Sequence, residues 1–432
     1  MGPFAGAVTE SSVTFIVSTP VAGSVKIEYS ELENFANSGS TAEQLPGEVS
    51  GYTKHQANGL KTDTRYYYRA VISGKPDAKV HSFRTFPAEK NYTFSFGFGS
   101  CMQSGYASYD PYIFKTIAAD TSLRFFVQLG DWSYPDFTYG RGYNKEWDLL
   151  VKTYNTRYSY EYDFPKHVLS VMPVVYVYDD HDFAGNNTNG TEAGKENSFR
   201  AYQTMFPHYR LENPSNGIWQ SFRFADAEFF VIDSRSQRSP NAEAFDSDGS
   251  FNPPEGHSML AGFDIAGTNQ MDWLINGLKN STAKWKVIVS PVMFNPEYAV
   301  FLKNALIKTQ PQLINDIVDK WAGFPGDIKK VTGAIEQNNI KNVIVISGDS
   351  HSSFIDDGTN SVIPEIGSSN LDVTNTKLNL KAAMFGYTIF NRGGYDGDGR
   401  AYGRVTFTTN DVLMEIIDEK GVVTASYRLT SK

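Results

Sequence analysis

Side chains that bind metals follow four apolar runs in this 432-residue sequence. In chain order they are Cys101, then Asp131 with Tyr134, then Asp179-Asp180-His181-Asp182, and then Asp349 with His351. Thiolate, carboxylate, phenolate and imidazole groups bind di- and trivalent cations, and such groups around two neighbouring cations serve hydrolytic chemistry on phosphorus. The residue types therefore suggest metal-assisted hydrolysis.

The run from Asp179 to Asp182 is the most informative of these segments. A single aspartate after a strand usually caps a helix or a turn, and a lone cysteine such as Cys101 usually fills a small space in the core. Four adjacent ionisable groups after the apolar residues 174–178 would repel one another, and a cation would remove that cost. The joint presence of all four segments, rather than any one, predicts a site.

The elements that would position these residues are strands that alternate with helices. Apolar strand patterns lie at 94–98, 123–129, 174–178, 287–289 and 343–346. Helical patterns lie near 110–120, 144–162, 192–206, 268–280 and 313–338. This alternation predicts an α/β core whose strands are buried on both faces, and ligands bind at the carboxyl ends of such strands. Residues 383–429 alternate again and predict strands that complete a second sheet.

Residues 1–88 predict a small all-β domain of their own. Strand patterns at 13–18, 23–29 and 64–71 are separated by turn-rich segments. The segment from Leu60 to Tyr68 resembles the late part of a fibronectin type III domain, where a leucine and a tyrosine lock a strand crossover. We therefore expect a fibronectin III- or Ig-like sandwich over 1–88. We expect a β-rich α/β catalytic domain over 89–432, with two sheets flanked by helices.

Composition and charge narrow the class of protein. The chain is 41% hydrophobic and 20% charged, with a net charge of -9, which fits a folded protein and disfavours nucleic acid or anionic lipid as general partners. No run of about 18 apolar residues is present, so no membrane span is expected. One cysteine excludes an intramolecular disulfide. A single cysteine suits either a cytosolic or a bacterial secreted protein. Of these two we expect the second, a secreted or periplasmic monomer whose signal peptide is not present in this chain.

The motifs together resemble a known superfamily. The order of the motifs is similar to that of the calcineurin-like metallophosphoesterases. It runs from Gly-Asp-x-x-Tyr, through a carboxylate or amide before His-Asp, to Gly-x-x-His. The chain departs from their usual pattern, because Ser100-Cys101 replaces Asp-x-His and Asp180 replaces an asparagine. Asp349 and Ser290-Pro291 each stand where a histidine is usual. These departures, together with Asp233-Ser234-Arg235 and the N-terminal sandwich, resemble the PhoD family of alkaline phosphatases and phosphodiesterases.

The resemblance implies a centre that holds Fe(3+) and Ca(2+). One half-site would contain Cys101, Asp131, Tyr134 and His351, whose anionic ligands suit trivalent iron. The other would share Asp131 and add Asp180 and Asp349, and this oxygen-rich set also suits magnesium or manganese. Whether Asp179 or Asp180 is the direct ligand stays open.

Three further residues are candidates for catalysis. His181 would protonate the leaving oxygen or orient another ligand, and Asn187 would donate to the phosphate or cap a turn. Arg235 would neutralise charge near the site or pair with Asp233. Residues 240–262 and the segment after Asn295 are expected to cover the metals.

The sequence thus predicts hydrolysis of small or polymeric phosphate esters, mono- or diester, by a water that two metals activate. The alternative is a catalytically inactive surface-binding protein on a phosphatase fold. The intact ligand set favours the enzyme.

Overall fold

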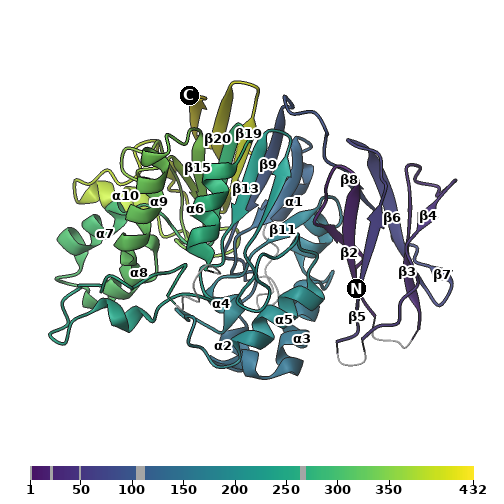
Figure 1. The fold of residues 1–432 in the computed structure, drawn as a ribbon, viewed down its shortest axis with the longest axis horizontal. Coiled ribbons are helices and arrows are strands. Elements are labelled where there is room, and N and C mark those ends of the chain that lie inside the picture. The colour runs from purple at the N-terminus through teal and green to yellow at the C-terminus, as the bar shows by residue number, and fades with distance from the viewer. Residues whose placement is uncertain (1, 20–22, 48–49, 104–111, 263–268) are drawn as a thin grey trace.

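The fold has an all-β part next to a larger part in which two sheets are flanked by helices. It is seen in a computed structural model, which describes residues 2–19, 23–47, 50–103, 112–262 and 269–432. Figure 1 shows the N-terminal strands grouped at one end of the molecule and the rest of the chain around the two larger sheets. No helix within these ranges is long and apolar enough to cross a membrane.

The first part consists of two antiparallel sheets. One contains β1 (Phe4–Gly6), β2 (Ser12–Ser18) and β5 (Tyr52–Asn58). The other contains β3 (Val25–Ser30), β4 (Gly39–Ser40), β6 (Arg65–Ile72), β7 (Lys75–Pro76) and β8 (His81–Arg84). The two sheets pack through aromatic rings, with the Phe15 centroid 4.8 Å from that of Tyr68 and 5.7 Å from that of Phe83. The expected all-β organisation is present, and its likeness to a fibronectin or Ig domain stays a prediction.

The crossover expected between Leu60 and Tyr68 has a local lock. Tyr66 is buried on β6, and its hydroxyl accepts a hydrogen bond of 3.0 Å from the Lys61 backbone N–H. Leu60 is buried beside it. A buried tyrosine hydroxyl needs such a partner, so this contact fixes the entry into β6.

The larger part contains two mixed sheets. The six-stranded sheet has the order β11 (Val174–Tyr176), β10 (Leu123–Gln128), β9 (Phe94–Gly99), β19 (Ala401–Phe407), β20 (Asp411–Asp418), β21 (Val423–Thr430). The seven-stranded sheet has the order β12 (Gln220–Phe224), β13 (Ala227–Val231), β14 (Trp285–Ser290), β15 (Val343–Ser347), β17 (Glu365–Ser368), β16 (Ser353–Asp356), β18 (Gly394–Tyr395). Strands β9–β11 are parallel to one another, as are β13, β14, β15 and β17. The expected two-sheet α/β architecture is confirmed.

Aromatic side chains fill the space between these two sheets. Phe96 on β9 stacks on Phe125 at 5.1 Å and meets Phe229 of the other sheet edge-on at 5.3 Å. Phe407 on β19 lies 5.7 Å from Trp285 on β14. Rings pack closely on pleated surfaces, and this accounts for the abundance of phenylalanine.

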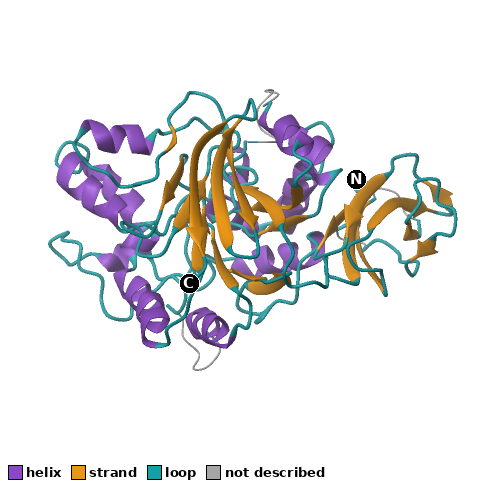
Figure 2. Ribbon diagram, turned by 90° about the horizontal axis from the view of Figure 1, so that it is seen from above, coloured by secondary structure: helices purple, strands orange, loops and turns teal. Residues whose placement is uncertain are grey.

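Helices cover the outer faces of the two sheets (Figure 2). The α-helices are α1 (Ile113–Ala119), α2 (Pro135–Tyr139), α3 (Trp147–Arg157), α4 (Asp180–Phe183), α5 (Lys195–Met205), α6 (Gln270–Asn280), α7 (Glu297–Phe301), α8 (Ile314–Val318), α9 (Pro325–Gln337) and α10 (Leu378–Met384). Residues 164–169 and 302–306 form π-helical turns. Short 3-10 turns lie at 143–145, 241–244, 311–313 and 321–323. Of the expected helical segments, residues 110–111 and 268 lie outside the described ranges.

The expected helix over 313–338 is wrong as a single element. The chain forms α8, then a 3-10 turn at Trp321–Gly323, and then α9, which begins at Pro325. Proline fits the first turn of a helix and disfavours helical geometry in the residue before it. The break turns Asp319, Lys320 and Trp321 inward, where all three are buried.

Candidate metal centre

The ends of parallel strands from both sheets bring the candidate ligands together. Cys101 follows β9, Asp131 follows β10, Asp180 follows β11 and Asp349 follows β15. The candidate ligands form three sets, and within each set the ligand atoms lie within 4.8 Å of one another. The sets are Cys101, Asp131 and His351; Asp131, Asp180 and His181; and Asp179, Asp180 and Asp349. Six of the seven candidate ligands belong to these sets. The seventh, Tyr134, contacts Asp131 of the first set.

The backbone at the candidate ligands is strained. Cys101, Asp131, Asp349 and His351 have φ values of 60°, 52°, 58° and 49°. L-residues other than glycine rarely adopt this left-handed region, and such strain concentrates at functional sites. The strand-end turns therefore hold these side chains toward one point at some cost in backbone energy.

Gly130 allows the loop of Asp131 to approach the loop of Asp179. Its φ is +95°, and a Cβ added there would lie 2.5 Å from the Cβ and 2.6 Å from the backbone N of Asp179. Only glycine satisfies both conditions, which explains the glycine in this Gly-Asp motif.

We expect Gly130→Ala to lower the free energy of unfolding by about 3 kcal/mol or more, because it adds overlap to an unfavourable φ. Gly74→Ala is the matched control. Its φ is +76°, but no atom lies within 4 Å of the added Cβ, so it should cost only about 1 kcal/mol. Urea unfolding of both variants measures the difference. Equal losses would show that the approach to Asp179 does not matter.

In the first set of ligands, Cys101 and Asp131 are buried, His351 is half-buried, and the hydrogen bonds of Asp131 are incomplete. Oδ2 of Asp131 lies 3.6 Å from the Cys101 Sγ and 3.3 Å from the Tyr134 hydroxyl. Oδ1 of Asp131 is buried without a hydrogen-bond partner among the described residues. Burial and neighbouring acidic groups raise the pKa of Cys101, and burial also raises the pKa of Asp131. A buried carboxylate oxygen without a partner is costly, and a cation would compensate it.

His351 is suited to bind a cation in its neutral form. Burial, together with the charges of Lys320 and His181, lowers its pKa to about 4. A neutral imidazole keeps a nitrogen lone pair for a metal.

Each ionisable group in the run Asp179–Asp182 meets a different environment. Asp179 pairs with Arg235, His181 with Asp136, and Asp182 with the buried Arg157. Asp180 instead accepts backbone N–H groups, at 2.7 Å from both His181 and Asn187. The protein itself thus supplies much of the compensation that the sequence alone assigned to a cation. Asp180 faces Asp131 and Asp349.

Arg235 lies behind the ligands. Its guanidinium binds both oxygens of Asp179 at 2.6 and 2.9 Å and both oxygens of Asp319 at 2.8 and 3.0 Å. The remaining N–H donates to the Thr188 carbonyl at 3.3 Å. Arginine has five N–H donors, and all five are engaged at full burial. The guanidinium also lies 3.8 Å from an Asp180 oxygen and 3.9 Å from an Asp349 oxygen, so its charge is next to two candidate ligands. Its catalytic role stays a prediction.

His181 is held by a residue that the sequence analysis did not single out. Its Nδ1 lies 2.9 Å from both carboxylate oxygens of Asp136, which leaves Nε2 toward the cluster. Burial lowers the pKa of His181, but Asp180, Asp131 and Asp136 outweigh it and raise the pKa to about 11. Asp136 lies two residues after Tyr134, so its position in the Gly-Asp-x-x-Tyr loop was a usable signal.

Lys320 is the second such residue. Its ammonium pairs with the Asp349 carboxylate and donates to the Asp349 carbonyl at 3.0 Å. Asp349 and Asp319 raise the pKa of Lys320 against the effect of burial. Lys320 was not singled out because a continuous helix was expected over 313–338. The segment Gly323-Phe324-Pro325 does mark the break in that helix.

A cavity of about 630 Å³ opens over the cluster. Its lining includes Asp180, His181, Asn187, Asp349 and His351. The segment after Asn295 contributes through Tyr298, as expected, whereas the described residues of 240–262 do not line this cavity.

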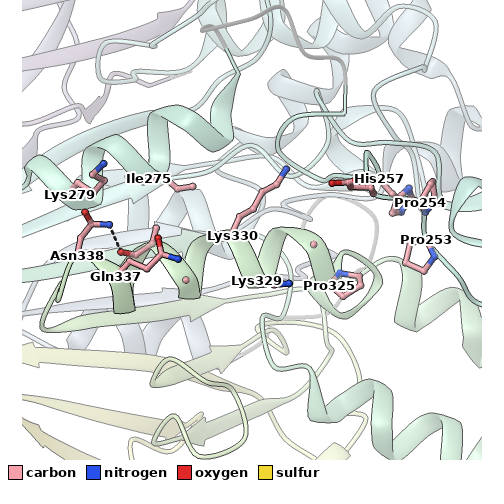
Figure 3. Close-up of a pocket in the computed structure, with 14 residues that line it drawn as sticks. Pro253, Pro254, His257, Ile275, Lys279, Pro325, Lys329, Lys330, Gln337 and Asn338 are labelled. Carbon is pink, nitrogen blue, oxygen red and sulfur yellow. Dashed lines mark hydrogen bonds between the residues drawn. The ribbon is translucent and has the colours of Figure 1, made fainter.

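A second cavity, of about 640 Å³, lies between α6 and α9 (Figure 3). Lys279, Lys329 and Lys330 line it, and the candidate ligands do not. The candidate metal ligands therefore lie at the first cavity and not at the second.

Comparisons with known proteins agree with this arrangement. The fold is similar to the solved structure of PhoD, with a TM-score of 0.72 at 18% identity over 99% of this chain and 91% of that one. It is also similar to a purple acid phosphatase from yellow lupin (Lupinus luteus) seeds, with a TM-score of 0.64 at 13% identity over 99% and 74%. Fold and site together define a metallophosphatase-like protein.

Sequence comparison specifies the class further. Residues 96–413 match the PhoD-like phosphatase family, and the chain belongs to that family. The chain is also 26% identical to alkaline phosphatase D of Bacillus subtilis (strain 168) over an alignment 440 residues long. The alignment covers 92% of this chain and 68% of that protein. The resemblance inferred from the motifs is confirmed.

Proposed function

We propose that the protein is a metal-dependent hydrolase of phosphate mono- or diesters that uses the cluster around Asp131. The observation that supports this most is the unpartnered, buried Oδ1 of Asp131 among a thiol, a phenol and an imidazole. This arrangement is unfavourable without a cation, and it lies beneath a cavity large enough for an organic phosphate.

The donor sets suit two different cations. Cys101, Asp131, Tyr134 and His351 would hold Fe(3+), because anionic ligands stabilise the higher charge. Asp131, Asp180 and Asp349 would hold Ca(2+), or Mg or Mn in its place, because these ions prefer oxygen. When bound, such cations neutralise phosphoryl oxygens and make water more acidic. Asp179 is engaged by Arg235, which favours Asp180 as the direct ligand.

His181 would deliver the proton that the leaving group needs. Water adds to phosphorus, the P–O bond to the leaving group breaks, and the leaving oxygen takes a proton from Nε2 of His181. Asp136 binds Nδ1 and so fixes the ring and its tautomer. Arg235 would act as a positioning residue through Asp179 and Asp319 rather than by contact with the phosphate.

Asn187 would donate its side-chain amide to a phosphoryl oxygen. Its φ is 56°, and its backbone N–H already binds Asp180 at 2.7 Å. Asn187→Gly keeps the left-handed backbone and this hydrogen bond and removes only the amide. We expect kcat to fall about 100-fold with unchanged stability, as for loss of one preorganised donor. Steady-state kinetics and thermal unfolding measure the two effects.

Asn339→Gly is the control for this change, because Asn339 also has a positive φ, of 50°, and is exposed. It should leave both properties unchanged. Full activity of Asn187→Gly would assign Asn187 to the turn alone.

Metal content and hydrolysis test the proposed function together. Protein purified without added metal or chelator should contain about one iron per chain, in addition to a hard divalent cation, and should hydrolyse p-nitrophenyl phosphate or its bis ester. Tyr134→Phe should remove visible absorption due to phenolate–iron charge transfer, and Cys101→Ala should lose iron. Zinc alone, or no metal after reconstitution with iron and calcium, would contradict the assignment. The relative rates on the two esters decide between monoester and diester.

We also propose a domain division, an oligomeric state and a location for this protein. A division at residue 88, with a fibronectin III- or Ig-like sandwich before the catalytic part, is supported by two facing sheets within residues 4–84. A monomer that acts outside the cytoplasm is the state we propose for the mature enzyme. Sedimentation and cell fractionation test these two points.

A further inference from the structure

The cavity over the cluster has two chemically different halves. Asp180, His181, Asp349 and His351 form its inner end, whereas apolar side chains form much of the rest: Phe301, Leu302, Leu306, Leu313, Leu378 and Phe385. The further charged residues in the lining are Asp316, Lys381 and Lys320, and the last of these is already paired with Asp349. A polyanionic substrate would gain little from such a wall, and an apolar group would gain contact area.

The base of the apolar wall is buried in the protein, because Phe301, Leu302 and Leu378 are at most 7% exposed. Phe301 ends α7, the following π-helical turn includes Leu302 and Leu306, and α10 is anchored by the buried Leu378. Phe301 and Phe385 lie 6.2 Å apart between ring centroids, so α7 and the end of α10 meet beside the cavity. The scaffold of the wall is therefore fixed.

The end of α10 leaves apolar surface exposed at this place. Met384 is 75% exposed and Phe385 is 51% exposed, and both line the cavity. Apolar side chains that are exposed in a concave site, next to groups that bind a ligand, usually contact that ligand.

We propose that this wall is a subsite for an alkyl, acyl or aryl chain carried by the leaving group of the phosphate ester. The inference rests on the proposed function, because the inner end of the same cavity would bind the phosphate. Hydrolysis adds water across the P–O bond and releases the chain as an alcohol, whose oxygen takes the proton from His181.

Contacts with the chain form equally in the ground state and in the transition state. The subsite should therefore lower KM and leave kcat almost unchanged. Burial of one methylene changes binding by up to about fourfold, so kcat/KM should rise by that factor per carbon until the wall is covered.

A series of n-alkyl phosphates from methyl to octyl, each below its micelle concentration, tests the subsite with the metal-loaded enzyme. The wild type should show the rise in kcat/KM, carried by KM. Phe385→Ala and Met384→Ala should reduce the gain per carbon and leave the methyl ester unaffected. Leu380→Ala is the control, because Leu380 is 45% exposed on the same helix but does not line the cavity. A flat wild-type series would overturn the subsite.

Binding of n-alkyl phosphonates, measured by calorimetry, separates this proposal from the proposed function. If no ester is hydrolysed but affinity grows with chain length, the subsite stands and the hydrolase assignment fails. If the methyl ester is hydrolysed and neither rate nor affinity depends on the chain, the subsite fails and the hydrolase assignment stands.

Dispersed and membrane-bound forms of one short-chain phospholipid identify the source of the chain. Faster hydrolysis in vesicles of phosphatidylcholine that contain it assigns the chain to a membrane lipid. Faster hydrolysis of the dispersed ester assigns it to a soluble metabolite. Both outcomes retain the subsite, and hydrolysis of neither, alongside rapid hydrolysis of methyl phosphate, counts against it.

Discussion

Asp131→Asn should reduce kcat/KM by about 1000-fold or more, which corresponds to about 4 kcal/mol of transition-state stabilisation. Asp131 belongs to two of the three sets of neighbouring ligand atoms and would help to hold both cations. An amide keeps the shape of the carboxylate but removes its charge, so both half-sites lose affinity. Kinetics with p-nitrophenyl phosphate and elemental analysis of the purified variant measure the two losses.

The same substitution should have the opposite effect on the stability of the metal-free protein. Burial raises the folded-state pKa of Asp131 above its unfolded value. The metal-free wild type should therefore lose stability as pH rises above about 4, and Asp131→Asn should not show this part of the loss. With metals present, the wild type should melt at the higher temperature, because ligands that bind only the folded state stabilise it. Identical pH dependence without metals would contradict the buried, uncompensated carboxylate.

Arg235→Met should lower the free energy of unfolding by about 3 to 5 kcal/mol, because it leaves the buried Asp179 carboxylate without its cation and leaves Asp319 with Arg238, 3.2 Å away, and the more distant Lys320. Asp179 and Asp319 bind the guanidinium on two sides, and all three side chains are at most 2% exposed. Activity should fall as well, since Asp179 precedes Asp180 and would no longer be fixed. Urea unfolding, combined with kcat and KM, gives both quantities.

Two further variants identify the cause of that loss. Adding Asp179→Asn to Arg235→Met should recover part of the stability, because the carboxylate left without a cation is then neutral. Arg392→Met is the exposed control. Arg392 pairs with Asp357 at 2.6 Å with 45% of its side chain exposed, and such pairs contribute about 0 to 1 kcal/mol. An equal loss in both single variants would refute the role given to burial.

The general position of the site could be predicted from the sequence because it depends on local patterns. Apolar strands followed at once by Cys101, Asp131, Asp180 and Asp349 place these residues at the carboxyl ends of strands. Which of the strands belong to which sheet does not affect that conclusion. The site joins β9–β11 of one sheet to β15 of the other, and the same residue patterns would have suited a single sheet.

The strand pattern does not predict the compensating charges, although the nearness of Asp136 to Tyr134 and the break marked by Gly323-Phe324-Pro325 were local signals. Asp319 and Lys320 reach the site because the chain breaks between α8 and α9, and Asp136 reaches it because a short helix begins at Pro135. These contacts depend on the packing of loops against the strand ends, for which periodicity carries no signal. The ion-pair alternative for Arg235 considered only its sequence neighbour Asp233, whereas the carboxylates that bind its guanidinium are 56 and 84 residues away.

The left-handed backbone at Cys101, Asp131, Asp349 and His351 bears on how this sequence would change under selection. Glycine relieves such strain, so substitutions that remove the candidate ligands would also relax the backbone that carries them. Selection for thermal stability alone, for instance in a directed-evolution experiment without added metal, would therefore favour loss of the site. Only repeated selection for turnover would keep these four residues together.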